Sequence, residues 1–337
     1  MRVYEIQEFG IDNLAQVGRE KPKAGLGQIV FKVKAASLNY RDLMTVTGRY
    51  NPKMALPRVP LSDGAGEVVE VGEGVTRVKA GDRVAAAFFP KWIDGSITPE
   101  FAKSALGGVV DGTLAEYVAI NAEGVVHIPE HLSFEEAATL PCAAVTAWNS
   151  LVVAGKLKAG DTVLVQGTGG VSIFGLQFAK VFGARVIATS SSDEKLKRVR
   201  ELGADETINY KETTDWDQRV LELTDGRGVD HVVEVGGAGT LNRSINAIRP
   251  GGGTIGMIGV LTGRSGEINT GAILMKGVRL QGIYVGSRKM FEDMNQAIEV
   301  SKMKPVVDRV FSFGEAREAL KFMESGSHFG KIVIKFD

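Results

Sequence analysis

The second half of the chain alternates strand-like and helix-like segments, and this rhythm constrains the fold more than any other feature. From residue 162 to residue 285, short runs rich in valine and isoleucine alternate with amphipathic stretches. Several runs, such as VLVQG at 163–167 and HVVEV at 231–235, are nearly continuous apolar segments, as expected for parallel strands covered on both faces. The pattern predicts an α/β fold with a doubly wound, six-stranded parallel sheet.

The first 120 residues follow a different pattern. Runs such as QIVFKVKAASL, GAGEVVEVG and LAEYVAI are separated by turn-forming residues, which is typical of a barrel-like β unit with few helices. Ser133 and Glu136 have the spacing of a capping box and predict the start of a helical stretch before the rhythm changes. The tail predicts two further helices and a last strand, KIVIKF.

Charge and cysteine usage narrow the class of protein. The 337 residues include 40 lysines and arginines and 40 aspartates and glutamates, a balance that argues against a nucleic-acid or anionic-membrane partner. The N-terminus has no apolar leader pattern and no run of about 18 apolar residues occurs, so we expect a soluble, cytoplasmic protein. The one cysteine, Cys142, excludes an internal disulfide and a multi-cysteine zinc site.

A glycine-rich loop joins the first strand of the alternating half to its helix. In VLVQGTGGVS, Gly167 and Gly169 follow the strand directly, and the third position of the dinucleotide fingerprint is Ser172, which is small. The first glycine permits the tight turn, and the second lets backbone N–H groups approach a pyrophosphate at the helix N-terminus. The loop therefore predicts a dinucleotide site formed by Gly167, Thr168, Gly169, Gly170 and Val171.

The end of the second strand bears on which dinucleotide binds. An acidic residue about 20 positions beyond the glycines would hold the ribose hydroxyl of NAD, whereas this strand runs into serines. Serines can hydrogen-bond a 2′-phosphate that a carboxylate would repel, so the sequence favours NADP(H). Asp193 and Glu194 count against this choice, and we interpret them as the N-cap and a first-turn acid of the next helix. The residues expected near the 2′-phosphate are Ser190, Ser191, Lys195 and Tyr210.

Several motifs together resemble the medium-chain dehydrogenase/reductase superfamily, which contains zinc alcohol dehydrogenases and zinc-free quinone oxidoreductases. They are GTGGVS, RVIATSSSDEKL, LGAD, PLSDGAGEVVEVGEGV, AGDRV and LAEYV, and the resemblance covers essentially the whole chain. It implies a GroES-like catalytic domain of residues 1–143 and 286–337 and a Rossmann NADP(H)-binding domain of residues 144–285, with nicotinamide in the cleft between them. In relatives the last strand of the Rossmann sheet pairs across a two-fold axis, so a homodimer is expected.

The resemblance also shows where a catalytic zinc would lie in the alcohol dehydrogenase branch. The matching positions are Asn39, Ser62, Asp63 and Cys142. Zinc needs about three protein ligands, most of them nitrogen or sulfur, and only one thiol is present here. The loop that carries four structural-zinc cysteines in relatives contains none in this chain. The sequence therefore favours metal-independent chemistry.

Without a Lewis acid, a conjugated acceptor is the easier substrate, because charge from an added hydride reaches an oxygen that hydrogen-bond donors can hold. The resemblance thus implies NADPH-dependent reduction of an enone, enal, enoyl or quinone small molecule. Two alternatives stay open: an NADP-dependent alcohol or aldehyde dehydrogenase, which Cys142 keeps possible, and a non-enzymatic NADPH-binding protein.

The resemblance assigns roles to particular residues. Tyr50 matches a tyrosine proton donor of enoyl reductases, Tyr40 is the alternative donor, and Asn39 is expected to hydrogen-bond near nicotinamide or substrate. On the cofactor side, Thr146 matches a residue that packs on nicotinamide. The remaining cofactor positions are the backbone of Ile258 and Val260, and Lys331 in a loop that borders the 2′-phosphate in relatives. The apolar residues of FFPKWIDG at 88–95 either shape a substrate mouth or pack as a surface loop.

Overall fold

The structure is a computed structural model that describes residues 1–337. The chain divides into two compact units: unit 1 comprises residues 1–145 and 286–337, and unit 2 comprises residues 146–285. The resemblance places these limits at 143/144 and 285/286. No helix of either unit is both long enough and apolar enough to span a membrane.

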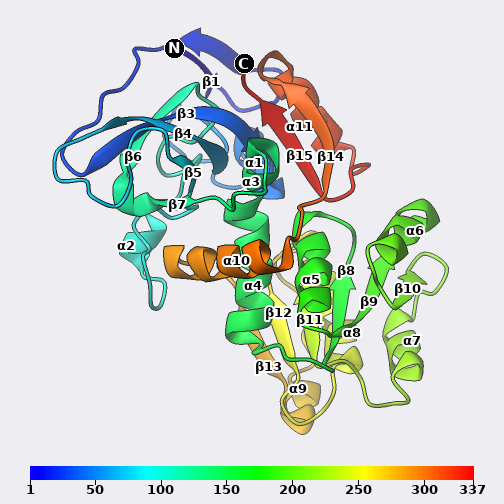
Figure 1. The fold of residues 1–337 in the computed structure, drawn as a ribbon. Coiled ribbons are helices and arrows are strands. Elements are labelled where there is room, and N and C mark those ends of the chain that lie inside the picture. The colour runs from blue at the N-terminus through cyan, green and yellow to red at the C-terminus, as the bar shows by residue number, and fades with distance from the viewer. The chain divides into compact units, whose positions relative to one another are not determined.

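Unit 2 contains the predicted six-stranded parallel sheet (Figure 1). Its spatial order is β10-β9-β8-β11-β12-β13, and every neighbouring pair is parallel. The order reverses between β8 and β11, which is the place where open α/β sheets bind ligands. The strands are β8 (Thr162–Gln166), β9 (Arg185–Ser190), β10 (Glu206–Asn209), β11 (His231–Glu234), β12 (Thr254–Met257) and β13 (Arg279–Gly282).

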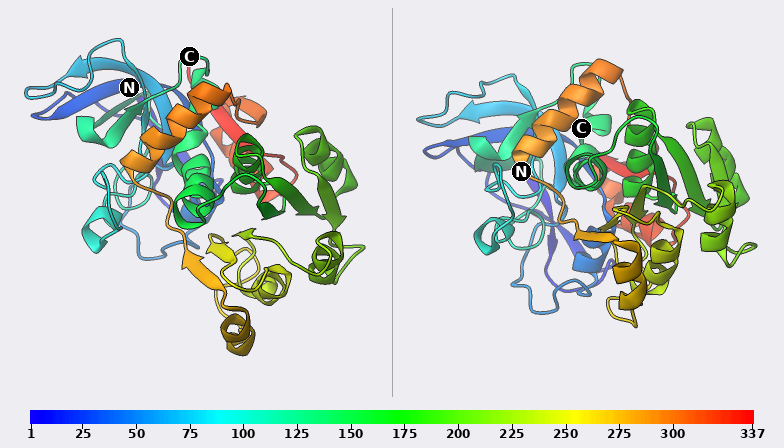
Figure 2. Two further views of the ribbon diagram at one scale, coloured as in Figure 1. Left: turned by 60° about the horizontal axis from the view of Figure 1, so that its bottom comes forward. Right: turned by 90° about the horizontal axis from the view of Figure 1, so that it is seen from below.

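Helices cover both faces of this sheet, as the two views of Figure 2 show. Successive residues of a strand point to opposite faces of the sheet, so each strand packs against helices on both sides. Leu164 and Val232 join a core with residues of α7 and α8. Their neighbours Val165 and Val233 lie against Gly175 of α5. A Cβ at Gly175 would come within 3.3 Å of Val233, so this glycine permits the close approach of helix and sheet. The helices are α5 (Gly170–Val181), α6 (Asp193–Glu201), α7 (Trp216–Leu223), α8 (Ala238–Ala247) and α9 (Thr270–Lys276).

Unit 1 is built on a seven-stranded, mainly antiparallel sheet. The main path is β14-β15-β3-β4-β5-β7, with β6 on β3, while β1 and β2 form a separate pair. The C-terminal strand β15 lies antiparallel to β3, with Val333 opposite Ser37. The strands are β1 (Arg2–Ile6), β2 (Leu14–Gly18), β3 (Gln28–Ser37), β4 (Asp63–Val71), β5 (Arg83–Ala86), β6 (Tyr117–Asn121), β7 (Val125–His127), β14 (Val307–Ser312) and β15 (Lys331–Lys335).

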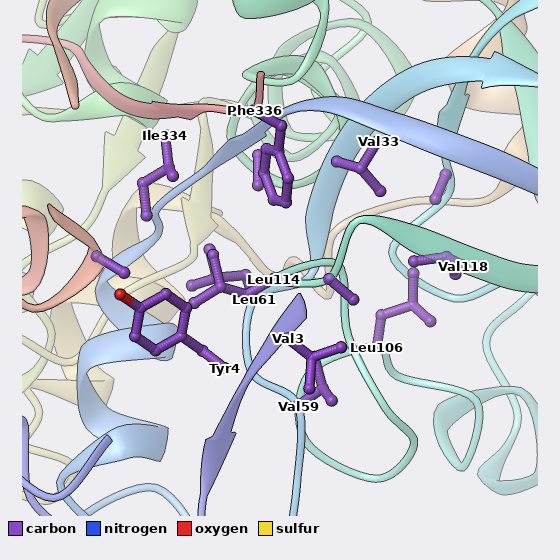
Figure 3. Packing of buried hydrophobic residues seen from close by; sticks show 14 of the residues in the cluster. Val3, Tyr4, Val33, Val59, Leu61, Leu106, Leu114, Val118, Ile334 and Phe336 are labelled. Carbon is purple, nitrogen blue, oxygen red and sulfur yellow. The ribbon is translucent and has the colours of Figure 1, made fainter. Parts of the chain in front are cut away.

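The core of unit 1 unites distant parts of the chain (Figure 3). Val3, Leu61, Leu114 and Ile334 are each fully buried in it, so the first and last strands share one apolar cluster. Helices surround the sheet, and the predicted capping box is confirmed: Ser133 and Glu136 exchange hydrogen bonds at the start of α3. The helices are α1 (Tyr40–Val46), α2 (Pro99–Ala102), α3 (Phe134–Ala137), α10 (Arg288–Ser301) and α11 (Ala316–Glu324), while α4 (Val145–Trp148) crosses the limit between the units.

Candidate functional site

Unit 1 contains a buried polar cluster assembled from the ends of four elements. Asn39 precedes α1, Ser62 and Asp63 stand at the start of β4, Cys142 lies in a π-helical turn (Leu140–Ala144), and Lys331 begins β15. Ser62 and Asp63 are fully buried, and Lys331 is 3% exposed. Polar groups at such depth need partners, so each hydrogen bond of the cluster constrains the others.

The ammonium group of Lys331 is the centre of this cluster. Its Nζ donates to Oδ1 of Asn39 at 2.6 Å and to the carbonyl oxygen of Leu38 at 2.7 Å. The carboxylate of Asp63 is an ion-pair partner of this ammonium, with Oδ2 3.9 Å from Nζ. The structure therefore places Lys331 among polar groups of unit 1, where the sequence suggested only a loop bordering a phosphate.

Asp63 is held by two further donors. The Ser62 hydroxyl donates to Oδ1 at 2.8 Å, and the backbone N–H of Cys142 donates to Oδ2 at 3.1 Å. Burial raises the pKa of Asp63, and the nearby Lys331 ammonium and these hydrogen bonds oppose that effect. Cys142 as a whole is half-buried, but its thiol lies inside, and burial followed by the Asp63 carboxylate raises the pKa of that thiol. The thiol is therefore protonated, and unreactive as a nucleophile, at neutral pH.

A second charged pair supports Asn39 from the other side. The fully buried carboxylate of Asp42 accepts from the backbone N–H of Asn39 at 2.8 Å. Burial, partly offset by Arg41, raises the pKa of Asp42 to about 6. Nη1 of Arg41 lies 3.9 Å from Asp42 and donates to the carbonyl oxygen of Leu106 at 2.6 Å, while its guanidinium stacks over Phe88. Arg41 is thus fixed in place by packing and hydrogen bonding.

The two candidate proton donors differ in how firmly they are held. Tyr40 is the first residue of α1 and is 47% exposed, and Tyr50, in the loop after α1, is 42% exposed. Neither hydroxyl has a hydrogen-bond partner within the chain, so both can reach a ligand. The Arg41 guanidinium lies 5.4 Å from the centroid of the Tyr50 ring, which restrains this ring. The choice of Tyr50 over Tyr40 stays a prediction.

The suggestion of an apolar mouth at 88–95 is wrong for its aromatic residues. Phe88, Phe89 and Trp92 are 5%, 1% and 3% exposed, so they are core residues of unit 1. Phe88 and Phe89 pack edge to face. The alternative interpretation, a packed surface loop, is correct about the packing, but the three aromatic side chains lie in the core and not at the surface.

The positions that match zinc ligands do not fit zinc. Oδ1 of Asn39 is occupied by the Lys331 ammonium, Ser62 donates to Asp63, and Cys142 is the one thiol. A cation close to the same oxygen atoms opposes the binding of a second one. Throughout residues 1–337, no three histidine, cysteine, aspartate or glutamate side chains are grouped so that they could hold a metal ion. The donor set is that of a hydrogen-bonding site.

In unit 2, the glycine loop has the geometry of a phosphate cradle. Gly167 adopts φ +72°, a conformation that favours glycine, and a Cβ at Gly167 or Gly169 would meet no atom within 4 Å. Ser172 donates to the carbonyl oxygen of Gln166 at 2.6 Å, which joins the helix to the strand. The N-terminus of α5 has no side-chain cap, so its first N–H groups can receive an anion. Thr168 is buried, and Gly170 and Val171 are half-buried beside it.

The residues expected near the 2′-phosphate lie at the ends of β9 and β10 and at the start of α6. Ser190 is buried, Ser191 and Lys195 are half-buried, and Tyr210 is 41% exposed.

The interpretation of Asp193 as a helix N-cap is wrong. Ser192 caps α6, accepting from the backbone N–H of Lys195 at 3.4 Å, and Asp193 is the first helical residue. The carboxylate of Asp193 instead accepts from Nδ2 of Asn209 at 2.8 Å. The cap is therefore one residue earlier than expected, and the acid of Asp193 is engaged with the neighbouring strand.

The backbone positions expected near nicotinamide are only partly available. The N–H of Ile258 donates to the carbonyl oxygen of Glu234 at 2.9 Å, so only its carbonyl oxygen can serve a ligand. Val260 is 44% exposed, and its carbonyl oxygen accepts from Gly263 at 3.1 Å. Thr146 is 4% exposed within α4. A shared role of these three residues at nicotinamide stays a prediction.

One residue of unit 2 escaped the sequence reasoning. The fully buried carboxylate of Glu234 accepts from Gln166 at 2.8 Å, from Thr240 at 2.6 Å, from the backbone N–H groups of 236–237 at 2.9 and 3.0 Å, and from Ser244. These bonds connect the strand before the glycine loop to the loop after β11. The local sequence gives no sign of this role, because the donors come from three separate elements.

Comparison with known proteins agrees with both units. Residues 25–130 match the family model of the alcohol dehydrogenase GroES-like domain, and residues 170–301 match that of zinc-binding dehydrogenases. A zinc-type alcohol dehydrogenase-like protein of Schizosaccharomyces pombe is 47% identical over 335 residues, covering 97% of this chain and 96% of the relative. A 2-methylene-furan-3-one reductase of Solanum lycopersicum is 33% identical, covering 91% of this chain and 71% of the relative.

The crystal structure of a candidate alcohol dehydrogenase from Sinorhizobium meliloti has 44% identity and a TM-score of 0.93, covering 99% of this chain and 98% of that one. The similarity extends over both units. The chain therefore belongs to the medium-chain dehydrogenase/reductase superfamily, a group of oxidoreductases that bind nicotinamide cofactors.

Proposed function

We propose that the protein is an NADPH-dependent, metal-independent oxidoreductase that transfers a hydride to an activated double bond or a quinone. The observation that carries this proposal is the polar cluster of unit 1, which offers hydrogen-bond donors where a metal enzyme would offer ligands. Lys331 and Ser62 engage groups that zinc would require, and Cys142 is the one thiol of the chain.

The donor set matches the charge that develops on a conjugated acceptor. Hydride addition to the β-carbon of an enone or enal moves negative charge onto the carbonyl oxygen. An amide N–H can stabilise this developing charge by donating a hydrogen bond to the oxygen. Asn39 has such an amide: its Oδ1 faces Lys331, and its Nδ2 donates to the Ser62 hydroxyl at 3.4 Å. An unactivated ketone would develop a full alkoxide and would need a stronger stabiliser, such as a metal ion.

The residues of unit 2 fit a phosphorylated dinucleotide. The loop 167–171 would hold the pyrophosphate, and Ser190, Ser191, Lys195 and Tyr210 would surround the 2′-phosphate. Asp193, one of the two acids at the start of α6, is engaged with Asn209. A bound NADPH supplies the hydride. The preference for NADPH over NADH rests on these polar and basic side chains.

A proton must reach the reduced product, and Tyr50 is the proposed donor. Tyr50 is 42% exposed, its hydroxyl has no hydrogen-bond partner within the chain, and Arg41 restrains its ring. Tyr40 is the alternative, since it is 47% exposed. The relative named 2-methylene-furan-3-one reductase supports this class of reaction, because its name describes a ketone conjugated to a carbon–carbon double bond.

We also propose that the protein forms a homodimer through β13. This strand is the edge of the unit 2 sheet, and all four of its residues are exposed. Leu280 on β13 is 41% exposed, and Leu274 and Met275 on α9 are 79% and 84% exposed. Pairing of two edges would satisfy the free backbone groups and cover these apolar side chains.

The test is NADPH oxidation by chelator-treated protein with a quinone, a 2-alkenal, an enone and a saturated aldehyde, followed by identification of each product. We expect reduction of the conjugated substrates and little reaction with the saturated aldehyde, with NADPH preferred over NADH.

A second candidate function, alcohol or aldehyde dehydrogenase, is favoured by the name of the Schizosaccharomyces pombe relative. Activity on the saturated aldehyde alone, or activity restored only by added zinc, would support it. Tight NADPH binding without turnover on any member of the panel would indicate a non-enzymatic NADPH-binding protein instead.

A further inference from the structure

Glu234 is a fully buried acid for which the function proposed above has no task. It ends β11, one position after Val233, which lies opposite Val165 of the parallel strand β8. The carboxyl ends of these two strands flank the place where the order of the sheet reverses, and ligands of such sheets bind outside it. An acid buried at this edge can influence a cofactor through the loops that leave the strands.

One carboxylate oxygen of Glu234, Oε1, organises the loop after β11. It accepts from the backbone N–H groups of Gly236 and Gly237 at 2.9 and 3.0 Å and from the Thr240 hydroxyl at 2.6 Å. Gly237 has φ +92°, and a Cβ there would come within 2.8 Å of the backbone of Val260. The loop after β11 is therefore folded over the carboxylate and packs directly against the loop after β12.

The other oxygen of Glu234, Oε2, fixes the residue before the glycine loop. Nε2 of Gln166 donates to this oxygen at 2.8 Å and to the Ser244 hydroxyl at 2.8 Å, and Ser244 in turn donates to the same oxygen. The amide oxygen of Gln166 accepts from the N–H of Gly236 at 3.4 Å. Gln166 directly precedes Gly167, so the position at which the glycine loop begins depends on this carboxylate.

The loop after β12 is joined to the same centre. The carbonyl oxygen of Glu234 accepts from the N–H groups of Ile258 and Gly259 at 2.9 and 3.2 Å. Thr262 donates from its N–H and its hydroxyl to the carbonyl oxygen of Gly236 at 2.7 and 2.9 Å. Three loops at the carboxyl edge of the sheet thus meet at one residue, and a change in its side chain reaches all of them.

We propose that Glu234 is a positioning residue: its carboxylate holds the loops after β8 and β11 in the arrangement that binds the dinucleotide. The outer side of the loops is open to a ligand, because a Cβ at Gly167 or Gly169 would meet no atom within 4 Å and Val260 is 44% exposed. Without the common acceptor, fewer molecules have the loops in place together, and the apparent dissociation constant of the cofactor rises as that fraction falls. The inference rests on the cofactor site proposed above, but on no particular substrate.

Glu234→Gln is the main test, because it keeps the shape of the side chain but turns one acceptor into a donor. On the side of Gly236 and Gly237 the new NH₂ group would meet two backbone N–H groups, so it turns to the other side and meets Nε2 of Gln166. The double variant, Glu234→Gln with Gln166→Glu, exchanges the two side chains. It matches donor with acceptor again, since the Ser244 hydroxyl can donate to either residue.

Asp230→Asn is the matched control. Asp230 is 3% exposed and stands directly before β11, at the end of the strand opposite to Glu234. It accepts from the backbone N–H of Thr162 at 2.8 Å and from the side chains of Arg227 and Arg249. Loss of this carboxylate should destabilise unit 2 without moving the loops at the carboxyl edge.

Dissociation constants of NADPH and NADH, measured by fluorescence titration without substrate, give the first readout. We expect Glu234→Gln to weaken both cofactors alike by about 10- to 100-fold, the scale of a lost hydrogen bond to a charged group, because the loops serve the part that the two cofactors share. The double variant should bind both nearly as tightly as the wild type, and Asp230→Asn should lower the melting temperature only. The proposal is wrong if Glu234→Gln binds both cofactors normally, if Asp230→Asn weakens them as much, or if the exchanged pair does not restore binding.

Hydrogen exchange in the cofactor-free protein is the second readout. We expect peptides that cover 166–172, 235–241 and 258–263 to exchange faster in Glu234→Gln and at wild-type rates in Asp230→Asn. Faster exchange confined to 235–241 would show that Glu234 orders only its own loop and would overturn the proposal. A wild type that binds neither cofactor would contradict the proposed function instead, while the exchange rates would still test the role of Glu234.

Discussion

Replacing Asp42 by asparagine should make the stability of unit 1 less dependent on pH. Asp42 is fully buried, and burial raises its pKa to about 6, against 3.8 for an unperturbed carboxyl. Because the folded state binds this proton more tightly than the unfolded state, Asp42 contributes most to stability at low pH. That contribution is lost as pH rises from 3.8 through 6.

The magnitude follows from the two pKa values. Each unit of difference is worth about 1.4 kcal/mol, so ionising Asp42 inside the fold costs about 3 kcal/mol once both states are fully ionised. Roughly half of this loss falls between pH 5 and pH 8. Asparagine cannot ionise, and its oxygen can still accept from the Asn39 backbone. The difference in unfolding free energy, wild type minus variant, should therefore fall by about 1.5 kcal/mol from pH 5 to pH 8.

Urea unfolding at pH 5, 6, 7 and 8 measures this difference if unit 1 is followed on its own. Cys142 is the only cysteine and its thiol lies inside unit 1, so a short thiol-labelling pulse at fixed pH reports the unfolded fraction. Asp111→Asn is the control: hydrogen bonds from Arg19 and the backbone of Val59 lower the pKa of Asp111 despite the opposing effect of burial, so the effect of this substitution should be constant over this range. The reasoning is refuted if the unfolding free energy of the wild type minus that of Asp42→Asn stays level or rises with pH.

Three further changes test the site. Tyr50→Phe should lower kcat several-fold and leave NADPH affinity nearly intact, with Tyr40→Phe as the matched control; unchanged turnover would remove Tyr50 from the mechanism. Lys195→Ala should weaken NADPH more than NADH by about 1.5 to 3 kcal/mol in fluorescence titrations, and an equal loss for both cofactors would contradict the 2′-phosphate assignment. Gly167→Ala, at φ +72°, should cost about 1–2 kcal/mol in unfolding and weaken both cofactors alike, whereas a fully active variant would show that the cradle tolerates a side chain.

The sequence predicted those parts of the fold that depend on local patterns. The parallel sheet follows from apolar runs such as 163–167, the cradle from Gly167, and the start of α3 from the spacing of Ser133 and Glu136. Helix limits were less certain, because adjacent Ser192 and Asp193 are both good caps and only the contact of Asp193 with Asn209 decides between them.

The polar cluster could not be predicted in the same way. Lys331 and Asn39 are 292 positions apart, and nothing around either residue indicates the other. Only the resemblance of its loop to one in relatives suggested that Lys331 borders the 2′-phosphate. The resemblance did identify Asn39, Ser62, Asp63 and Cys142 as neighbours, but not the cation that joins them.

The strand that completes the cluster has a consequence for how the protein is made. During translation, Lys331 on β15 emerges after all of residues 146–285, whereas Asn39 and Asp63 leave the ribosome early. Unit 2 can therefore fold on the nascent chain while the sheet of unit 1 still lacks β15 and the buried Asp63 has no counter-ion. A ribosome that stalls before residue 331 would hold a chain with a finished cofactor fold but no assembled polar cluster.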